Sequence, residues 1–130
     1  MPGNTYNLTK RTELRDLVLK KKPLIIKFTA TWCGPCKRIA PKFNELIEKV
    51  KHLVDVVIVD ADNGSDICSA LRVKGYPTFV SYVNGEMAES MVGSSESELL
   101  AFFKATIVRL IYFSTFIIMF PFIFHSIFFS

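Results

Sequence analysis

The sequence predicts an α/β fold in which a central mixed β-sheet is flanked by helices on both faces. One observation is the alternation of short apolar, β-branched runs with stretches of helical periodicity, which is typical of a sheet covered by helices. A second is Asn84-Gly85 between two strand-like runs, a strong two-residue hairpin signal that adds antiparallel strands at one side. The length of 130 residues suits a single domain.

Nine elements are predicted, in the order βαβαβαββα. The strands are expected over residues 5–8, 24–28, 54–59, 78–83 and 86–92. The first helix has Thr9 as its N-cap and runs to about Lys22, where Pro23 closes it. A long helix with an internal Pro41 runs to Val50, and a short one covers residues 65–71. Ser95, followed by Glu98 three residues later, is a capping box that opens the last helix.

Charge divides the chain in two. All sixteen Lys and Arg and all twelve Asp and Glu lie at or before Arg109, and the net charge is only +4. Residues 1–108 are therefore expected to form the folded domain, and residues 109–130 an apolar tail. The run Lys20 to Lys22 fits a solvated helix end, and no basic stripe with interleaved aromatic residues is present, so nucleic acid is not an expected partner.

The tail is a candidate transmembrane anchor. Residues 110–129 are twenty uncharged residues, which as a helix cover about 30 Å, the thickness of a hydrocarbon core. Basic residues precede this run, so the domain would stay in the cytoplasm. Pro121 and His125 count against a span. The competing interpretations are a disordered or wrongly assigned Phe-rich extension and an apolar arm that packs onto a partner.

Three cysteines, Cys33, Cys36 and Cys68, are too few for the disulfide framework of a small secreted domain. The N-terminus has no long apolar run, so no signal peptide is expected. These features predict a reducing compartment, with the domain in the cytoplasm.

Cys33 and Cys36 have the setting of a reactive dithiol. Cys33 lies where a buried strand gives way to a helix, and the free amides and positive dipole end of a helix N-terminus favour a thiolate. Two intervening residues let Cys36 reach Cys33, so Cys33 can attack a substrate disulfide and Cys36 can resolve the mixed disulfide. Lys37 adds positive charge. An inert structural disulfide across two residues is the alternative, and it would be unusual in a reducing compartment.

Metal and haem chemistry fit less well. A structural zinc site needs four ligands, and the remaining candidates, Cys68, His52 and His125, are not paired. A c-type haem site needs His where Lys37 stands. No metal and no cofactor are expected.

The segment from Ala30 to Lys37, ATWCGPCK, resembles the active-site signature of the thioredoxin family. Pro41, the run from Gly75 to Thr78, Asn84-Gly85 and Gly93 match further features of that family, and the resemblance covers about residues 5–106. It implies the thioredoxin fold, disulfide reductase activity on disulfide-containing protein substrates, and an upstream thiol reductase or other electron donor.

The resemblance also implies roles for individual residues. Trp32 would belong to the substrate-docking surface, and Gly34-Pro35 would form the turn that accompanies a reducing dithiol. Tyr76 and Pro77 would form the loop that faces Cys33, with a cis peptide bond between them. Cys68 is interpreted as a small buried hydrophobe without a catalytic role.

One position departs from the family pattern. Thioredoxins usually carry a buried acid six residues before the first cysteine, where it assists proton transfer to the second, and Lys27 stands there. Either Lys27 points to solvent, or a cation lies beneath the dithiol and tunes its redox chemistry. Because of Lys27 and the tail, a second hypothesis is a membrane-tethered binding or assembly module whose dithiol is incidental.

Overall fold

A computed structural model describes residues 3–118 of the chain. Its strands are β1 (Thr5–Asn7), β2 (Leu24–Thr29), β3 (Asp55–Asp60), β4 (Thr78–Val83) and β5 (Glu86–Val92). Its helices are α1 (Arg11–Leu19), α2 (Gly34–Val50), α3 (Ser65–Ala70) and α4 (Glu96–Ile118). The predicted order of elements is confirmed, and most boundaries agree with the prediction to within one residue.

The five strands form one mixed sheet with the order β1-β3-β2-β4-β5. The central strand β2 pairs parallel with β3 and antiparallel with β4. Every residue of β2 from Leu24 to Phe28 therefore has a neighbour on both sides. This strand, buried along most of its length, leads directly into the loop that carries the two cysteines.

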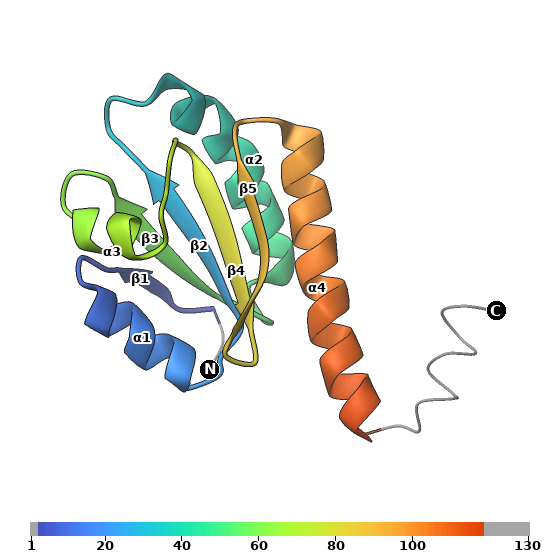
Figure 1. Ribbon diagram of the computed structural model, residues 1–130. Coiled ribbons are helices and arrows are strands. Elements are labelled where there is room, and N and C mark those ends of the chain that lie inside the picture. Colours follow the sequence, from blue (N-terminus) through green and yellow to red (C-terminus); the bar gives the residue numbers. More distant parts are fainter. Residues whose placement is uncertain (1–2, 119–130) are drawn as a thin grey trace.

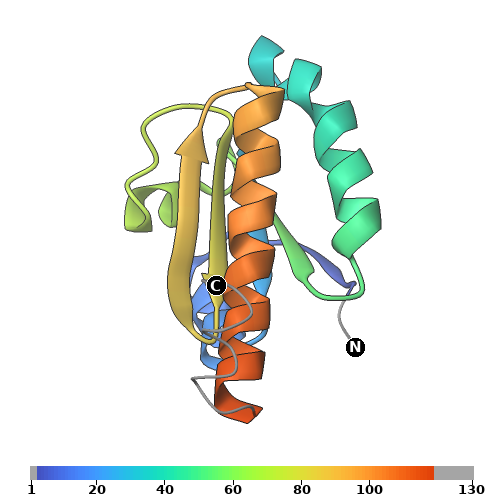
Figure 2. The ribbon, with the colours of Figure 1, turned by 90° about the vertical axis from the view of Figure 1, so that its right-hand side faces the viewer.

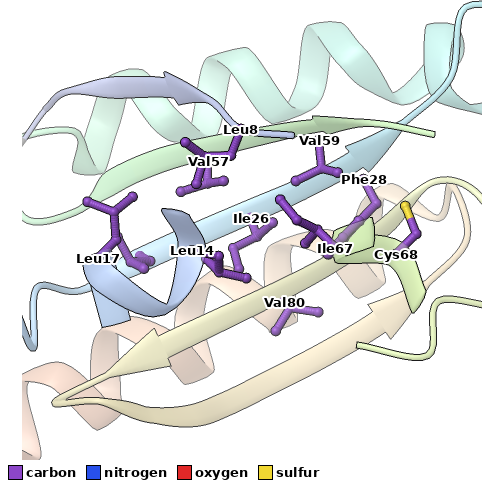
Figure 3. Close-up of a cluster of buried hydrophobic side chains, with 11 residues drawn as sticks. Leu8, Leu14, Leu17, Ile26, Phe28, Val57, Val59, Ile67, Cys68 and Val80 are labelled. Carbon is purple, nitrogen blue, oxygen red and sulfur yellow. The ribbon is translucent and has the colours of Figure 1, made fainter. Parts of the chain in front are cut away.

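Helices cover both faces of the sheet, as predicted (Figure 1). Helices α1 and α3 lie on one face, where Leu14, Leu17 and Ile67 pack against apolar side chains of β2, β3 and β4 (Figure 3). Helices α2 and α4 lie side by side on the other face (Figure 2), and their Phe43 and Phe102 meet Phe79 of β4 there. The three central strands of the sheet are thus mostly buried on both faces, and α2 starts just beyond one end of β2.

The β4–β5 hairpin turns at Asn84 and Gly85, as predicted. Both residues have positive φ, 54° and 82°, which is the backbone combination of a type I′ turn and suits Asn-Gly. The start of α4 is also as expected, because the Glu98 backbone N–H donates to the Ser95 hydroxyl at 3.3 Å. Local turn and cap chemistry therefore governs these two connections.

The limits of α1 differ from the prediction. Its N-cap is Lys10 rather than Thr9, because the Glu13 carboxylate accepts from the backbone N–H groups of both Thr9 and Lys10. The helix ends at Leu19 rather than near Lys22, and Lys21 adopts a left-handed φ of 60°. The chain thus leaves the helix before Pro23, so Pro23 does not terminate it.

Helix α4 crosses the predicted domain boundary. It is continuous from Glu96 to Ile118, so the division at residue 108 falls inside one helix. Of the predicted membrane segment 110–129, residues 119–129 lie outside the described residues. Across residues 3–118, no helix combines the length and apolar character needed to cross a membrane.

Candidate active site

Cys33 and Cys36 are joined in a disulfide at the start of α2. Cys33 is the N-cap of the helix, and Cys36 lies in its first turn. The Cys36 backbone N–H donates to the Cys33 sulfur at 3.2 Å, in the way that an N-cap side chain satisfies a free amide of the first turn. The sequence-predicted pairing of the two cysteines at a helix start is confirmed.

The surroundings of Cys33 favour a negatively charged sulfur. When the disulfide is reduced, the amide that contacts Cys33 and the positive end of the α2 dipole stabilise its thiolate. The first turn of α2 contains no acidic residue, and Lys37 and Arg38 are exposed beside it. Pro35 occupies an early helical position where its missing N–H costs no intrahelical bond.

The dithiol is buried but lies next to an exposed aromatic surface. The exposed fractions of Cys33 and Cys36 are 4% and 6%, whereas that of Trp32 is 65%. The Trp32 ring meets the edge of the Tyr76 ring at a centroid distance of 5.8 Å. Tyr76 itself packs against the small cluster formed by Ala30 and the two cysteines. A protein that docks on these rings therefore approaches the sulfur atoms.

The loop before β4 brings Tyr76 and Pro77 to the cysteines. The Tyr76–Pro77 peptide bond is cis, as expected from the family resemblance. Hydrogen bonds hold the loop on both sides of this bond. The Thr78 hydroxyl donates to the Gly75 carbonyl at 2.6 Å, and the Gly93 N–H donates to the Pro77 carbonyl at 2.9 Å. The buried Pro77 is thus held to the end of β5, next to Tyr76, which packs against the cysteines.

Lys27 lies on the face of β2 that α2 covers and is partly buried. Its ammonium is 4.9 Å from the centre of the Phe43 ring, and Phe43 is two helical turns beyond Cys36. Desolvation by burial lowers the pKa of Lys27 below its ordinary value. The lysine is therefore directed under α2 rather than fully into solvent, and its contact is with an aromatic ring of the core.

Two residues near the dithiol did not emerge from the sequence as site residues. The Trp32 indole N–H points to the Asp62 carboxylate at 3.5 Å, a weak contact. Asp62 follows β3, whose carboxyl end adjoins that of its parallel neighbour β2, so the proximity of the two strand ends is the signal that could have revealed it.

The other residue is Cys68, for which the sequence predicts a small buried hydrophobe without a catalytic role. It is buried, on α3 at the edge of the cluster shown in Figure 3. A side-chain hydrogen bond with Cys68 is the main cause that raises the pKa of Tyr76 to about 12, and burial raises it further. Cys68 thus touches a docking residue, and no sequence pattern signals this contact.

Among residues 3–118, no group of three or more His, Cys, Asp or Glu side chains is placed to hold a metal ion. The chemistry that this arrangement performs resides in the two sulfur atoms. A dithiol that closes into a disulfide at a helix N-terminus exchanges electrons with other disulfides. The chain is therefore a thiol–disulfide oxidoreductase.

Comparison with known proteins identifies the family. The thioredoxin family model matches residues 5–105. Thioredoxin-1 of Schizosaccharomyces pombe is 38% identical over 96 residues, which are 74% of this chain and 92% of the relative. Thioredoxin-1 of Caenorhabditis elegans is 44% identical over 79 residues, which are 61% of this chain and 68% of the relative.

Solved structures of thioredoxins also resemble this chain. Mitochondrial thioredoxin 3 from Saccharomyces cerevisiae, in its oxidised form, is 35% identical and superposes with a TM-score of 0.71, covering 77% of this chain and 93% of that one. The chain belongs to the thioredoxin family. It has the thioredoxin fold, and it is a protein-disulfide reductase that works by thioredoxin-type thiol–disulfide exchange.

Proposed function

We propose that Cys33 is the attacking cysteine and Cys36 the resolving cysteine of this reductase. The Cys33 thiolate attacks one sulfur of a substrate disulfide, which forms a mixed disulfide and releases the other sulfur as a thiolate. The Cys36 thiolate then attacks the Cys33 sulfur, which releases the second substrate thiol and closes the Cys33–Cys36 disulfide. Two electrons pass from the enzyme to the substrate.

The position of Cys33 supports this assignment. It is the N-cap of α2 and receives an amide hydrogen bond, so its thiolate is the better stabilised of the two. Cys33 also directly follows Trp32, the exposed ring of the docking surface. Trp32, Tyr76 and Pro77 would bind the substrate backbone and side chains next to the sulfur, while Gly34 and Pro35 set the turn between the two cysteines.

The substrates are proteins with accessible disulfides, and an upstream thiol reductase or other electron donor restores the dithiol. Each turnover leaves the enzyme oxidised, so two electrons must be returned before the next. A cytoplasmic, reducing setting suits this cycle. The closed Cys33–Cys36 pair, packed against Tyr76, favours a reductase over a binding module with an incidental dithiol.

Reduction of insulin by dithiothreitol tests the proposed activity. Dithiothreitol regenerates the enzyme, and insulin precipitates when its interchain disulfides are reduced. The full chain should shorten the lag before precipitation, and the variant in which both cysteines are serine should not. Equal lags for the two proteins would contradict the reductase function.

The same chain is proposed to associate with membranes through residues 110–129, on the basis of the uncharged composition of that run. Carbonate extraction of membranes from expressing cells tests this proposal. The full chain should stay in the pellet, and a chain ending at residue 109 should be released. Release of the full chain would contradict an integral anchor.

A further inference from the structure

An open cavity of about 460 Å³ lies beside the docking surface, on the α3 side of the molecule. Its wall includes two hydroxyl side chains of α3, Ser65 and Ser69, and two basic side chains of the loop that follows, Arg72 and Lys74. Ala61 and Tyr76 complete the wall on the side of the dithiol. The cavity is polar, in contrast to the apolar core clusters on both faces of the sheet.

The cavity adjoins the active site. Ala61 and Tyr76, which line it, are the same two residues that pack against the cluster of Ala30, Cys33 and Cys36. These two side chains therefore connect the cavity wall to the dithiol. A peptide whose disulfide is attacked by Cys33 therefore has neighbouring residues within reach of the cavity.

Backbone hydrogen bonds hold the basic side of the cavity. The Arg72 N–H donates to the Ser69 carbonyl at 3.1 Å, and the Val73 N–H donates to the Cys68 carbonyl at 2.9 Å. These bonds cap α3 and anchor the start of the loop, where Arg72 has a left-handed φ of 55°. The two basic residues are thus carried by an anchored segment.

The charges that line the cavity are all positive. Arg72 and Lys74 are exposed, and neither takes part in any ion pair found among residues 3–118. The nearby Asp66 of α3 is already paired with Arg11 at 2.7 Å. The cavity therefore presents two positive charges that form no ion pair within the described residues.

Two carboxylates also lie near Tyr76. Asp62 contacts Trp32, and Asp60 accepts from the backbone N–H groups of Asp62 and Asn63. Both carboxylates act electrostatically on Tyr76. Neither residue lines the cavity, whose charged lining residues are Arg72 and Lys74.

We propose that this cavity is a substrate subsite that binds an acidic segment flanking the disulfide of a protein substrate. The inference rests on the proposed reductase function and adds a substrate class to it. Acidic side chains would pair with Arg72 and Lys74, and the hydroxyls of Ser65 and Ser69 would donate to them. A basic flanking segment would be disfavoured at the same place.

The test compares two synthetic peptides that share one disulfide loop and differ only in the flanking residues, three glutamates in one and three lysines in the other. Their kcat/KM values are measured with the full chain, with Arg72→Glu, with Lys74→Glu and with the double variant. Lys104→Glu is the matched control, because Lys104 is an exposed lysine of α4 on the opposite face of the sheet. Reduction of uncharged 2-hydroxyethyl disulfide reports the dithiol chemistry alone.

The wild type should prefer the glutamate peptide, and each single reversal should lower kcat/KM for that peptide about three- to tenfold, through KM. The double variant should prefer the lysine peptide, and about 0.5 M salt should remove both preferences. Lys104→Glu should leave the ratio of the two kcat/KM values within about twofold of the wild type. Activity toward 2-hydroxyethyl disulfide should be the same in all variants.

Equal kcat/KM values for the two peptides in the wild type, with 2-hydroxyethyl disulfide still reduced, would overturn the subsite and leave the reductase function standing. A change in the ratio caused equally by Lys104→Glu would also overturn it, since net charge would then explain the preference. Absence of turnover with 2-hydroxyethyl disulfide in the wild type would instead contradict the proposed function.

Discussion

At the scale of single residues, Lys27 is the departure with the clearest chemical consequence. A thioredoxin-type dithiol usually has a carboxylate at this position, and here an ammonium lies under α2 against Phe43. A cation stabilises the thiolate of the reduced state, so it raises the reduction potential and makes the protein a weaker reductant. The contact with Phe43, two turns from Cys36, places the charge at some distance from the sulfur atoms.

We predict that Lys27→Asp lowers the reduction potential. At 1.5 Å per residue, seven residues of α2 separate Phe43 from Cys36 by about 10 Å, and a unit charge at that distance contributes about 1.7 kcal/mol at an effective dielectric constant of 20. For a two-electron couple this is on the order of 35 mV for each unit of charge, and Lys27→Asp changes the charge by two units, so its shift should be about 70 mV. Redox titration against glutathione measures the shift.

Lys27→Met is the control, because it removes the charge without adding a carboxylate. It should give about half the downward shift of Lys27→Asp, because it changes the charge by one unit instead of two. Burial lowers the pKa of Lys27, so the wild-type potential should approach that of Lys27→Met as the pH rises. A potential that is unchanged or higher in Lys27→Asp would show that Lys27 does not act on the dithiol.

Tyr76 gives a second prediction at this scale. Its folded-state pKa of about 12 lies above the ordinary value of 10.0, so the folded state holds the proton more tightly than the unfolded state. The stabilisation is complete below about pH 10 and is lost as the pH rises from about 10 to 12. In denaturant unfolding, Tyr76→Phe should lose stability less steeply over this range than the wild type. Equal slopes for the two proteins would contradict the raised pKa.

At the scale of elements, the hairpin between β4 and β5 depends on one glycine. Gly85 has a φ of +82°, which costs an L-residue about 1–2 kcal/mol. A Cβ atom there would meet neighbours only at 3.6 Å, an ordinary contact, so backbone strain is the whole cost. We predict that Gly85→Ala lowers the free energy of unfolding by about 1–2 kcal/mol in thermal or urea unfolding.

Gly75→Ala is the matched comparison. No left-handed φ is found at Gly75, and an added Cβ would meet Val92 at 3.4 Å. Alanine at such a position restricts the unfolded chain more than the folded one, so the substitution should be neutral or stabilising. A destabilisation as large as that of Gly85→Ala would show that the sign of φ does not set the difference.

The sequence predicts the helices and strands better than it predicts the contacts around the site. The hairpin was located to the residue, because Asn-Gly needs positive φ at both central positions and few other pairs tolerate it. The end of α1 is not located correctly by the sequence. Pro23 predicts a helix that runs to about Lys22, whereas the chain leaves the helix earlier, through a left-handed Lys21. The N-cap lies one residue later than predicted, because the Glu13 carboxylate accepts from the backbone N–H groups of both Thr9 and Lys10.

At the scale of the whole molecule, the sequence identified the chemistry but not the surface around it. The spacing of Cys33 and Cys36 and their place between strand and helix are local features, and local features are readable in a sequence. Asp62 and Cys68 come near the site only because β3 pairs with β2 and because α3 packs under the loop of Tyr76. Contacts of this kind depend on tertiary packing, which no short pattern records.

The central claim is that Cys33 attacks the substrate and Cys36 resolves the mixed disulfide, and a trapping experiment tests it most directly. Cys36→Ser and Cys33→Ser variants of the reduced full chain are incubated with a disulfide-containing protein, and covalent complexes are measured by mass spectrometry under non-reducing conditions. Cys36→Ser should accumulate a mixed disulfide through Cys33 that dithiothreitol reverses, and Cys33→Ser should form none and turn nothing over. Substantial turnover by Cys33→Ser, together with no trapped complex in Cys36→Ser, would contradict the account.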